Sequence, residues 1–231
     1  MSSDKQGVKE MMDDFFGAYI KPSSTEFIRL LPDGLVLGTG ILYILSFCKS
    51  YGYLLLAMLE LMILQRAFSN IIGKISPIRG GPNTGAPVCQ TGFMSNNMMR
   101  ISAIEAIGLQ SYLPSPTMFF VSGVIAYMVG GVQEFKNEIV TLGGDISGRN
   151  TTVMIFSLLF LLMVFMFKIV YGCEEFGPLL LSLLLGGIMG YLVMYQNKSV
   201  FGRDSVNVLN LPMIVSGIER GKPMFVCGPS P

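Results

Sequence analysis

The 231-residue sequence contains no histidine and no tryptophan, and charged residues make up only 13% of it. Histidine is the commonest general base near neutral pH and a frequent metal ligand, so the usual centre of many catalytic and metal sites is missing. Without tryptophan, any aromatic belt at a membrane interface must be built from tyrosine and phenylalanine. The formal net charge of +1 gives no general attraction to nucleic acid, and we expect no nucleic-acid partner.

The sequence is instead rich in apolar residues, which make up 51% of it. They are concentrated in five stretches, grouped as two, one and two: Leu31–Cys48, Tyr51–Phe68, Pro116–Val132, Thr151–Tyr171 and Phe176–Tyr195. Stretches of about 17–25 mainly apolar residues match the hydrocarbon core of a bilayer. We therefore expect an all-α membrane protein with about five transmembrane helices, arranged as a hairpin, a single span and a second hairpin.

The connections between the apolar stretches predict how neighbouring spans are joined. Lys49-Ser50-Tyr51-Gly52 combines a charge, a polar residue and a glycine, which predicts the turn of the first hairpin. One long tilted helix is the alternative, although about 30 residues would overshoot a core of about 30 Å. Pro32 is expected to interrupt a short helix that begins near Ser23. The last stretch follows the tight link Cys173-Glu174-Glu175, so we expect the last two spans to pack antiparallel.

These features divide the chain into five segments. We expect an amphipathic interfacial segment over residues 1–30, a transmembrane hairpin over 31–69, a Gly/Pro-rich extramembrane loop with a short helix over 70–115, three transmembrane helices over 116–195, and an extended docking tail over 196–231. Apolar residues in the extramembrane segments are candidates for docking a partner protein. These candidates are Phe15, Phe16, Met98, Ile101, Val208, Leu211, Met224 and Phe225.

Two glycine pairs and two charged residues stand out within the spans. Gly34 with Gly38, and Gly186 with Gly190, have the four-residue spacing that lets a second helix approach closely, although the same spacing also arises by chance. Glu60 is the one acidic residue deep within a predicted span, and such a carboxyl suggests ion binding or proton relay by default. The simpler interpretation is a neutral or paired structural carboxyl, and the Lys168 side chain could extend towards it.

No pattern of catalytic or metal-binding residues is present in the sequence. The four cysteines, Cys48, Cys89, Cys173 and Cys227, form no metal-spaced pair, and we expect them to be reduced thiols. No nucleophile elbow and no phosphate-binding loop is present. We therefore expect no catalytic residues, no metal, no cofactor and no small-molecule substrate, and we do not expect an enzyme.

The C-terminal segment contains two stretches that carry a resemblance, Phe201–Pro212 and Lys222–Cys227. Together they resemble the tails of small multipass membrane proteins of large icosahedral double-stranded DNA viruses. The lack of tryptophan and the short apolar spans with terse loops fit this resemblance. It implies a minor capsid or inner-membrane virion protein that ties the capsid shell to an internal membrane derived from the host endoplasmic reticulum, and it assigns no functional residues.

Two functions follow as hypotheses. The first is a structural membrane protein whose partners are the lipid bilayer and other structural proteins of a shell or scaffold. The second is a small transporter or channel subunit that uses Glu60, with Gly186 and Gly190 at an oligomeric interface. Transporters normally bring several polar groups together at the midplane, and Glu60 is nearly alone there, so the sequence favours the structural hypothesis. The distribution of lysine and arginine favours a cytoplasmic N-terminus.

Overall fold

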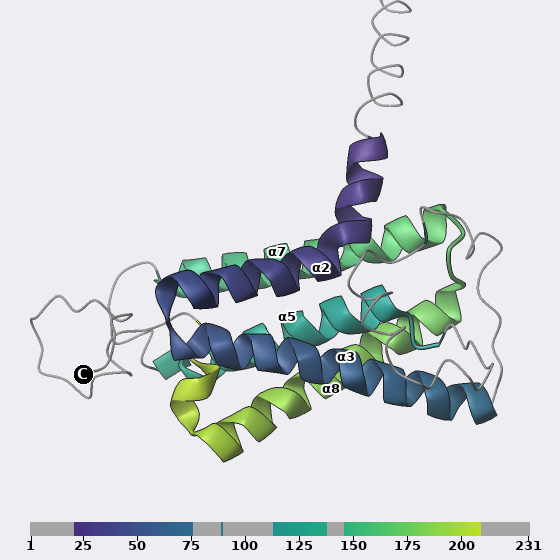
Figure 1. The fold of residues 1–231 in the computed structure, drawn as a ribbon. Coiled ribbons are helices and arrows are strands. Elements are labelled where there is room, and N and C mark those ends of the chain that lie inside the picture. The colour runs from purple at the N-terminus through teal and green to yellow at the C-terminus, as the bar shows by residue number, and fades with distance from the viewer. Residues whose placement is uncertain (1–20, 76–88, 90–112, 138–145, 209–231) are drawn as a thin grey trace, which may run out of the picture.

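The computed structural model describes residues 21–75, 89, 113–137 and 146–208, and these residues form a bundle of helices (Figure 1). Its elements are α2 (Lys21–Ser46), α3 (Lys49–Ile75), α5 (Pro116–Glu134), α7 (Ile146–Val170), α8 (Phe176–Phe201) and the 3-10 helix η4 (Arg203–Val206). The described part contains no strand, and its five α-helices are long and apolar enough to cross a membrane. The predicted fold class is therefore confirmed.

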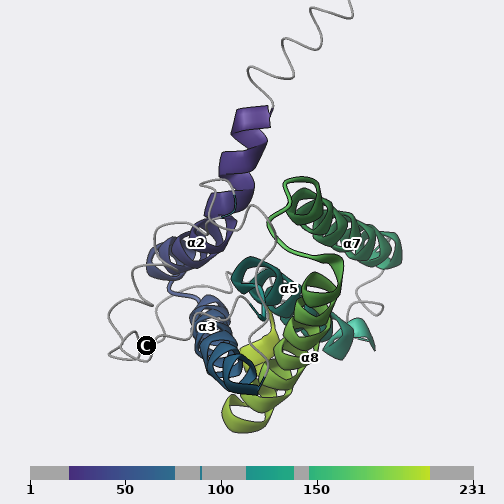
Figure 2. The same cartoon turned by 90° about the vertical axis from the view of Figure 1, so that its right-hand side faces the viewer.

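Helix α5 lies at the centre of the bundle, with the other four helices around it (Figure 2). In its most apolar stretch 61% of the residues are buried, compared with 17% in α7. The buried core includes Phe119 and Tyr127 of α5, Leu61 of α3 and Leu179 of α8. Large apolar side chains are exposed mainly along the outer faces of the surrounding helices, where a bilayer would contact them.

The first two spans form a hairpin, and the alternative of one long helix is wrong. The α-helical conformation breaks at Phe47, whose φ of 51° is left-handed. The Phe47 N–H donates to the Tyr43 carbonyl at 2.8 Å, and the Cys48 N–H donates to Ser46 Oγ at 3.3 Å. The turn thus lies at Phe47 and Cys48, and the predicted turn beginning at Lys49 is wrong because those residues already form the first turn of α3.

Pro32 does not end a helix as the sequence predicted. It lies inside α2, which continues to Ser46. The helix bends after its first turns instead, so that its beginning projects away from the bundle (Figure 1). A proline in a helix interior removes one backbone hydrogen bond and kinks the helix, and here the kink is tolerated without a break.

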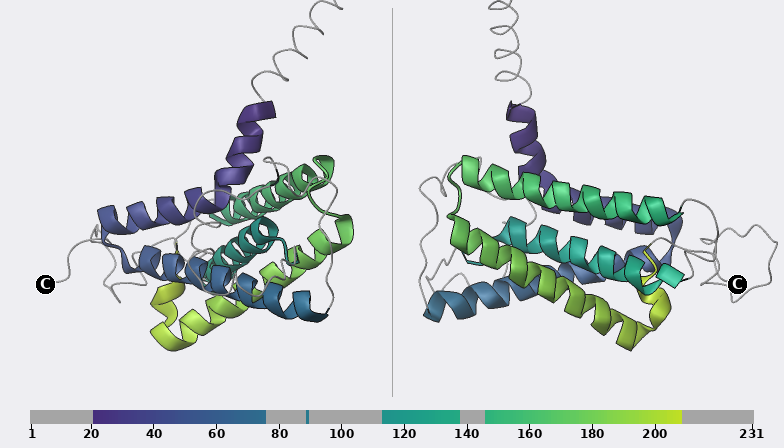
Figure 3. Two further views of the ribbon diagram at one scale, coloured as in Figure 1. Left: turned by 45° about the vertical axis from the view of Figure 1, so that its right-hand side comes forward. Right: turned by 180° about the vertical axis from the view of Figure 1, so that it is seen from behind.

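Helix α8 packs mainly along α5 and hardly along α7, so the expected antiparallel packing of the last two spans against each other is wrong. The end-on and rear views place α7 at the edge of the bundle (Figure 2, Figure 3). The physical reason is the close fit of α8 to α5. Gly186 and Gly190 let the α8 backbone approach α5, whereas α7 keeps large side chains such as Phe156, Leu159 and Met163 exposed.

Candidate functional site

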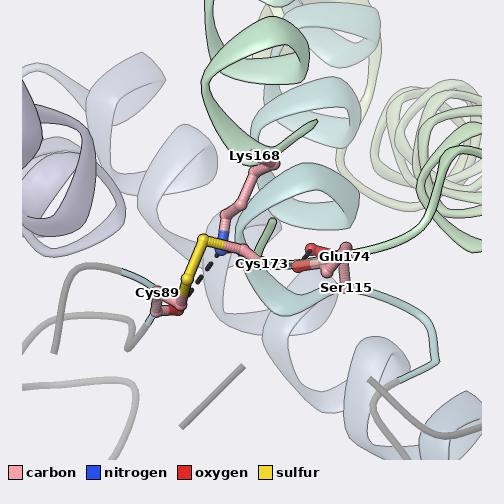
Figure 4. The surroundings of a disulfide bond; sticks show 5 residues. All are labelled: Cys89, Ser115, Lys168, Cys173 and Glu174. Atoms are coloured by element: carbon pink, nitrogen blue, oxygen red, sulfur yellow. Dashed lines mark hydrogen bonds and ion pairs between the residues drawn. A yellow bond between two sulfur atoms is a disulfide. The ribbon is translucent and has the colours of Figure 1, made fainter. Parts of the chain in front are cut away.

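A polar cluster lies at the end of the bundle where α8 begins, beside a disulfide bond (Figure 4). Lys168 comes from the last turn of α7, and Glu174 comes from the link that leads into α8. Ser115 immediately precedes α5, and Cys89 belongs to the connection between α3 and α5. The cluster therefore gathers segments that are distant in the sequence.

Lys168 and Glu174 form an ion pair that is almost fully removed from solvent. Their Nζ and Oε1 atoms are 3.4 Å apart, and the side chains are only 5% and 9% exposed. Lys168 Nζ also donates to the Cys89 carbonyl at 3.4 Å, and Ser115 Oγ donates to Glu174 Oε1 at 2.6 Å. Breaking such a pair by removing one partner is costly, because the remaining charge stays buried without compensation.

A second set of hydrogen bonds fastens the same end of the bundle to α3 and α8. The backbone N–H of Ser115 donates to Ser182 Oγ at 2.7 Å, and Gln65 Nε2 donates to the Pro114 carbonyl at 3.0 Å. Gln65 belongs to α3, and Ser182 belongs to α8. Four helices are therefore linked at this end, which gives the cluster a structural function.

The disulfide joins Cys89 to Cys173, whose Cα atoms are 5.3 Å apart. Cys48 is disulfide-bonded as well, while Cys227 lies outside the described residues. The expectation of reduced thiols is wrong for these three cysteines. Spacing in the sequence did not reveal the pairing, because 84 residues separate Cys89 from Cys173 and only the packing of α3, α5 and α7 brings them together.

Glu60 does not contact Lys168, so the predicted approach of these two side chains is wrong. Lys168 forms an ion pair with Glu174 and a hydrogen bond to the Cys89 carbonyl at the end of the bundle. Glu60 Oε2 is buried and has no hydrogen-bond partner within the described part of the chain. Elsewhere in the core, the Tyr127 hydroxyl accepts a hydrogen bond from Asn197 Nδ2 at 3.4 Å.

The opposite end of the bundle has its own ion-pair network, which the sequence did not reveal. Lys198 Nζ lies 2.7 Å from Glu134 Oε2, and Arg203 Nε lies 3.0 Å from Glu134 Oε1. Arg203 also donates to the Glu134 carbonyl at 2.7 Å and covers the Phe135 ring at 4.7 Å. Glu134 and Lys198 are 64 residues apart in the sequence, and the packing of α5 against α8 brings them together.

Gly186 and Gly190 form the close contact between α8 and α5. A Cβ atom added to Gly186 would collide with Ser122 Oγ and with the backbone of Phe119, whose Cα would be 2.8 Å away. One added to Gly190 would collide with the backbone of Gly123. The predicted helix contact is confirmed. It occurs within the chain, so these glycines are not available for the oligomeric interface of the transporter hypothesis.

Gly34 and Gly38 have a different environment. An added Cβ at either position would meet nothing within 4 Å, so neither glycine mediates a close helix contact among the described residues.

Val208, a predicted docking residue, is partly buried against the core, and a Cβ on Gly131 would lie 3.7 Å from its Cγ2 atom. Val208 therefore contacts its own chain. The other predicted docking residues, Phe15, Phe16, Met98, Ile101, Leu211, Met224 and Phe225, lie outside the described residues.

The interactions of the cluster link helices and are structural. Lys168 and Glu174 neutralise each other, and within the described ranges no group of three histidine, cysteine, aspartate or glutamate side chains gathers to hold a metal ion. Comparisons with models of protein families, with curated proteins and with solved structures found no match.

Proposed function

We propose that the protein is a structural integral membrane protein that anchors a protein shell or scaffold to a lipid bilayer. The observation that supports the proposal is the position and pairing of charged side chains in the described bundle. Lys168 pairs with Glu174 at one end, and Lys198 and Arg203 pair with Glu134 at the other, while the outer faces between them are apolar. This arrangement suits a rigid body held in a bilayer.

The start of the tail is fixed to the bundle, which suits an anchor that presents a docking segment. Ser205 Oγ donates to the Asn197 carbonyl at 3.0 Å, and Val206 is fully buried. The backbone carbonyl of Val206 lies against Gly131 of α5. Because η4 is held in this way, the chain after Val208 leaves from a defined point at one end of the bundle.

The nature of the shell follows from the resemblance of the tail to minor capsid and inner-membrane virion proteins. We assign the protein to the internal membrane of a virion, where the apolar residues after Val208 and those of the N-terminal segment would bind the capsid. Apolar segments that extend from a rigid body can cover a large partner surface and acquire order on binding.

Truncation of the tail tests the anchoring function. Residues 209–231 are removed and Val206 is kept, because Val206 belongs to the core. We expect the truncated chain to insert into membranes as the parent does and to lose its association with the shell protein, measured by quantitative cross-linking in infected or producing cells. A Cys227→Ser variant is the control that separates loss of the tail from loss of one cysteine. Unchanged association after truncation would refute the docking role.

A small transporter or channel subunit remains the second candidate, and one observation favours it. The buried oxygens Glu60 Oε2 and Asn197 Oδ1 have no hydrogen-bond partner within the described ranges, and unsatisfied polar atoms inside a membrane often mark ion paths. Ion flux into liposomes reconstituted with the parent and with Glu60→Gln distinguishes the two functions. An anchor gives no flux above protein-free liposomes in either case, whereas flux that Glu60→Gln abolishes identifies a transporter.

A further inference from the structure

The disulfide-bonded cysteines Cys48 and Cys173 lie at opposite ends of the membrane-spanning bundle. Between them the chain passes through three of the spanning helices, α3, α5 and α7, and an odd number of crossings leads to the other face of a membrane. Cys48 lies in the turn between α2 and α3, and Cys173 lies in the link between α7 and α8. This order places them on opposite faces whichever way the protein is oriented.

Contacts between the helices support the same separation. Tyr53, in the first turns of α3, stacks against Phe201 at the end of α8, with ring centroids 5.0 Å apart. Gln65 instead reaches the cluster at the beginning of α8 through Pro114. The 26 residues of α8 span about 39 Å, so the end of the bundle near Cys48 is a full membrane thickness away from Cys173.

We propose that Cys48 and Cys173 are oxidised on opposite faces of the membrane, so that one of the two disulfides forms on the cytosolic face through a dedicated protein thiol oxidant. The cytosol keeps thiols reduced, and luminal enzymes oxidise only the cysteines that face the lumen. In the cytosolic reaction, two thiols lose two protons and two electrons and form one S–S bond. The electrons reduce a disulfide of the oxidant to a dithiol by thiol–disulfide exchange.

Burial explains why both bonds persist once they have formed. The Cys48 and Cys173 residues are 5% and 1% exposed, so reduced glutathione has little access to either sulfur. Lys168 also donates to the Cys89 carbonyl, which holds the Cys89–Cys173 pair against the end of α7. The inference requires only that the bundle spans a membrane, and it does not depend on the anchoring function.

The separation of the two faces is tested with exposed cysteine reporters beside each native cysteine. Phe47→Cys and Glu175→Cys each add one thiol, at positions where the parent side chain is exposed. In sealed membrane vesicles of one orientation, a membrane-impermeant maleimide should label only one of the two variants, and detergent should then make the other reactive. Equal labelling of both variants before detergent would overturn the proposal.

The need for an oxidant is tested by counting thiols in the full-length chain. The protein is produced in cells whose disulfide machinery is confined to the secretory pathway, with and without a flavin-dependent sulfhydryl oxidase in the cytosol. Thiols are trapped with acid and counted as gel shifts with a polymer-linked maleimide. We expect two free thiols without the oxidase and none with it, and Cys48→Ser and Cys173→Ser identify which pair responds. Complete oxidation without the oxidase, or two thiols that persist with it, would overturn the proposal.

Discussion

Gly190 and Lys168 show how single residues determine the packing of this bundle. Gly190 lets the backbone of α8 touch the backbone of α5 at Gly123, since any side chain would occupy that space. Lys168 places a charge where solvent does not reach, and Glu174 balances it. The sequence predicted the glycine contact from its four-residue spacing. It could not predict the partner of Lys168, because an ion pair depends on how the end of α7 meets the following link.

Replacing Gly190 by alanine should destabilise the protein. The added Cβ would lie 2.7 Å from the Cα of Gly123, which is backbone and cannot move aside easily. We expect a loss of about 1–3 kcal/mol, as for other overpacked sites. Gly187→Ala is the matched control, because a Cβ at this neighbouring position meets nothing within 4 Å. Unfolding in mixed detergent micelles measures both variants, and equal stabilities would contradict the close contact.

Replacing Lys168 by methionine should destabilise the protein more strongly. The Glu174 carboxylate would remain buried without its counter-charge, at a cost of about 3–5 kcal/mol. The double variant Lys168→Met with Glu174→Gln should recover most of this loss, because no charge is then buried and glutamine can still accept the hydrogen bond from Ser115.

Lys198→Met is the control for the buried pair. Lys198 and Glu134 are 34% and 23% exposed, and Arg203 still neutralises Glu134 after the substitution. We therefore expect a loss of at most about 1 kcal/mol. The same unfolding assay applies to all three variants. If the double variant were no more stable than Lys168→Met, the destabilisation would not arise from an unpaired charge.

At the scale of elements, the sequence predicted the spans well and their neighbours poorly. Hydrophobic length alone located the five helices, although the structure extends α8 to Phe201, beyond the expected Tyr195. The short link Cys173-Glu174-Glu175 led to the wrong prediction that α7 packs against α8, since a short connection fixes only the ends of two helices. The partner of α8 is determined along its length by Gly186 and Gly190, which fit α5 and not α7.

The outward face of α7 offers a test of its contact with lipid. Leu159 lies near the middle of the helix and is 55% exposed. Leu159→Lys should reduce the insertion of α7 into membranes by about 2.5–3.5 kcal/mol, because a charged side chain at the centre of a span is costly. Thr151→Lys, near the start of the helix, should insert almost normally. A glycosylation-based insertion assay measures both, and equal insertion of the two variants would contradict a lipid-facing α7.

At the scale of the whole molecule, the five helices make a rigid apolar body with one polar network near each end. Sequence patterns alone could show the apolar spans, but both networks depend on tertiary packing. The crossing of α5 and α8 brings Lys198 to Glu134, and the edge position of α7 brings Cys173 to Cys89. These ion pairs and the disulfide stiffen the helix bundle. In our proposal, the extramembrane segments attach this bundle to a shell.

Native mass spectrometry of the full-length protein, released from its own membranes with mild detergent, tests the anchoring claim most directly. An anchor between a bilayer and a shell should be released together with a shell or scaffold protein at a fixed stoichiometric ratio. The complex should be lost when residues 209–231 are removed. A homogeneous oligomer of this chain alone, with no other protein bound and with no effect of the truncation, would contradict the account.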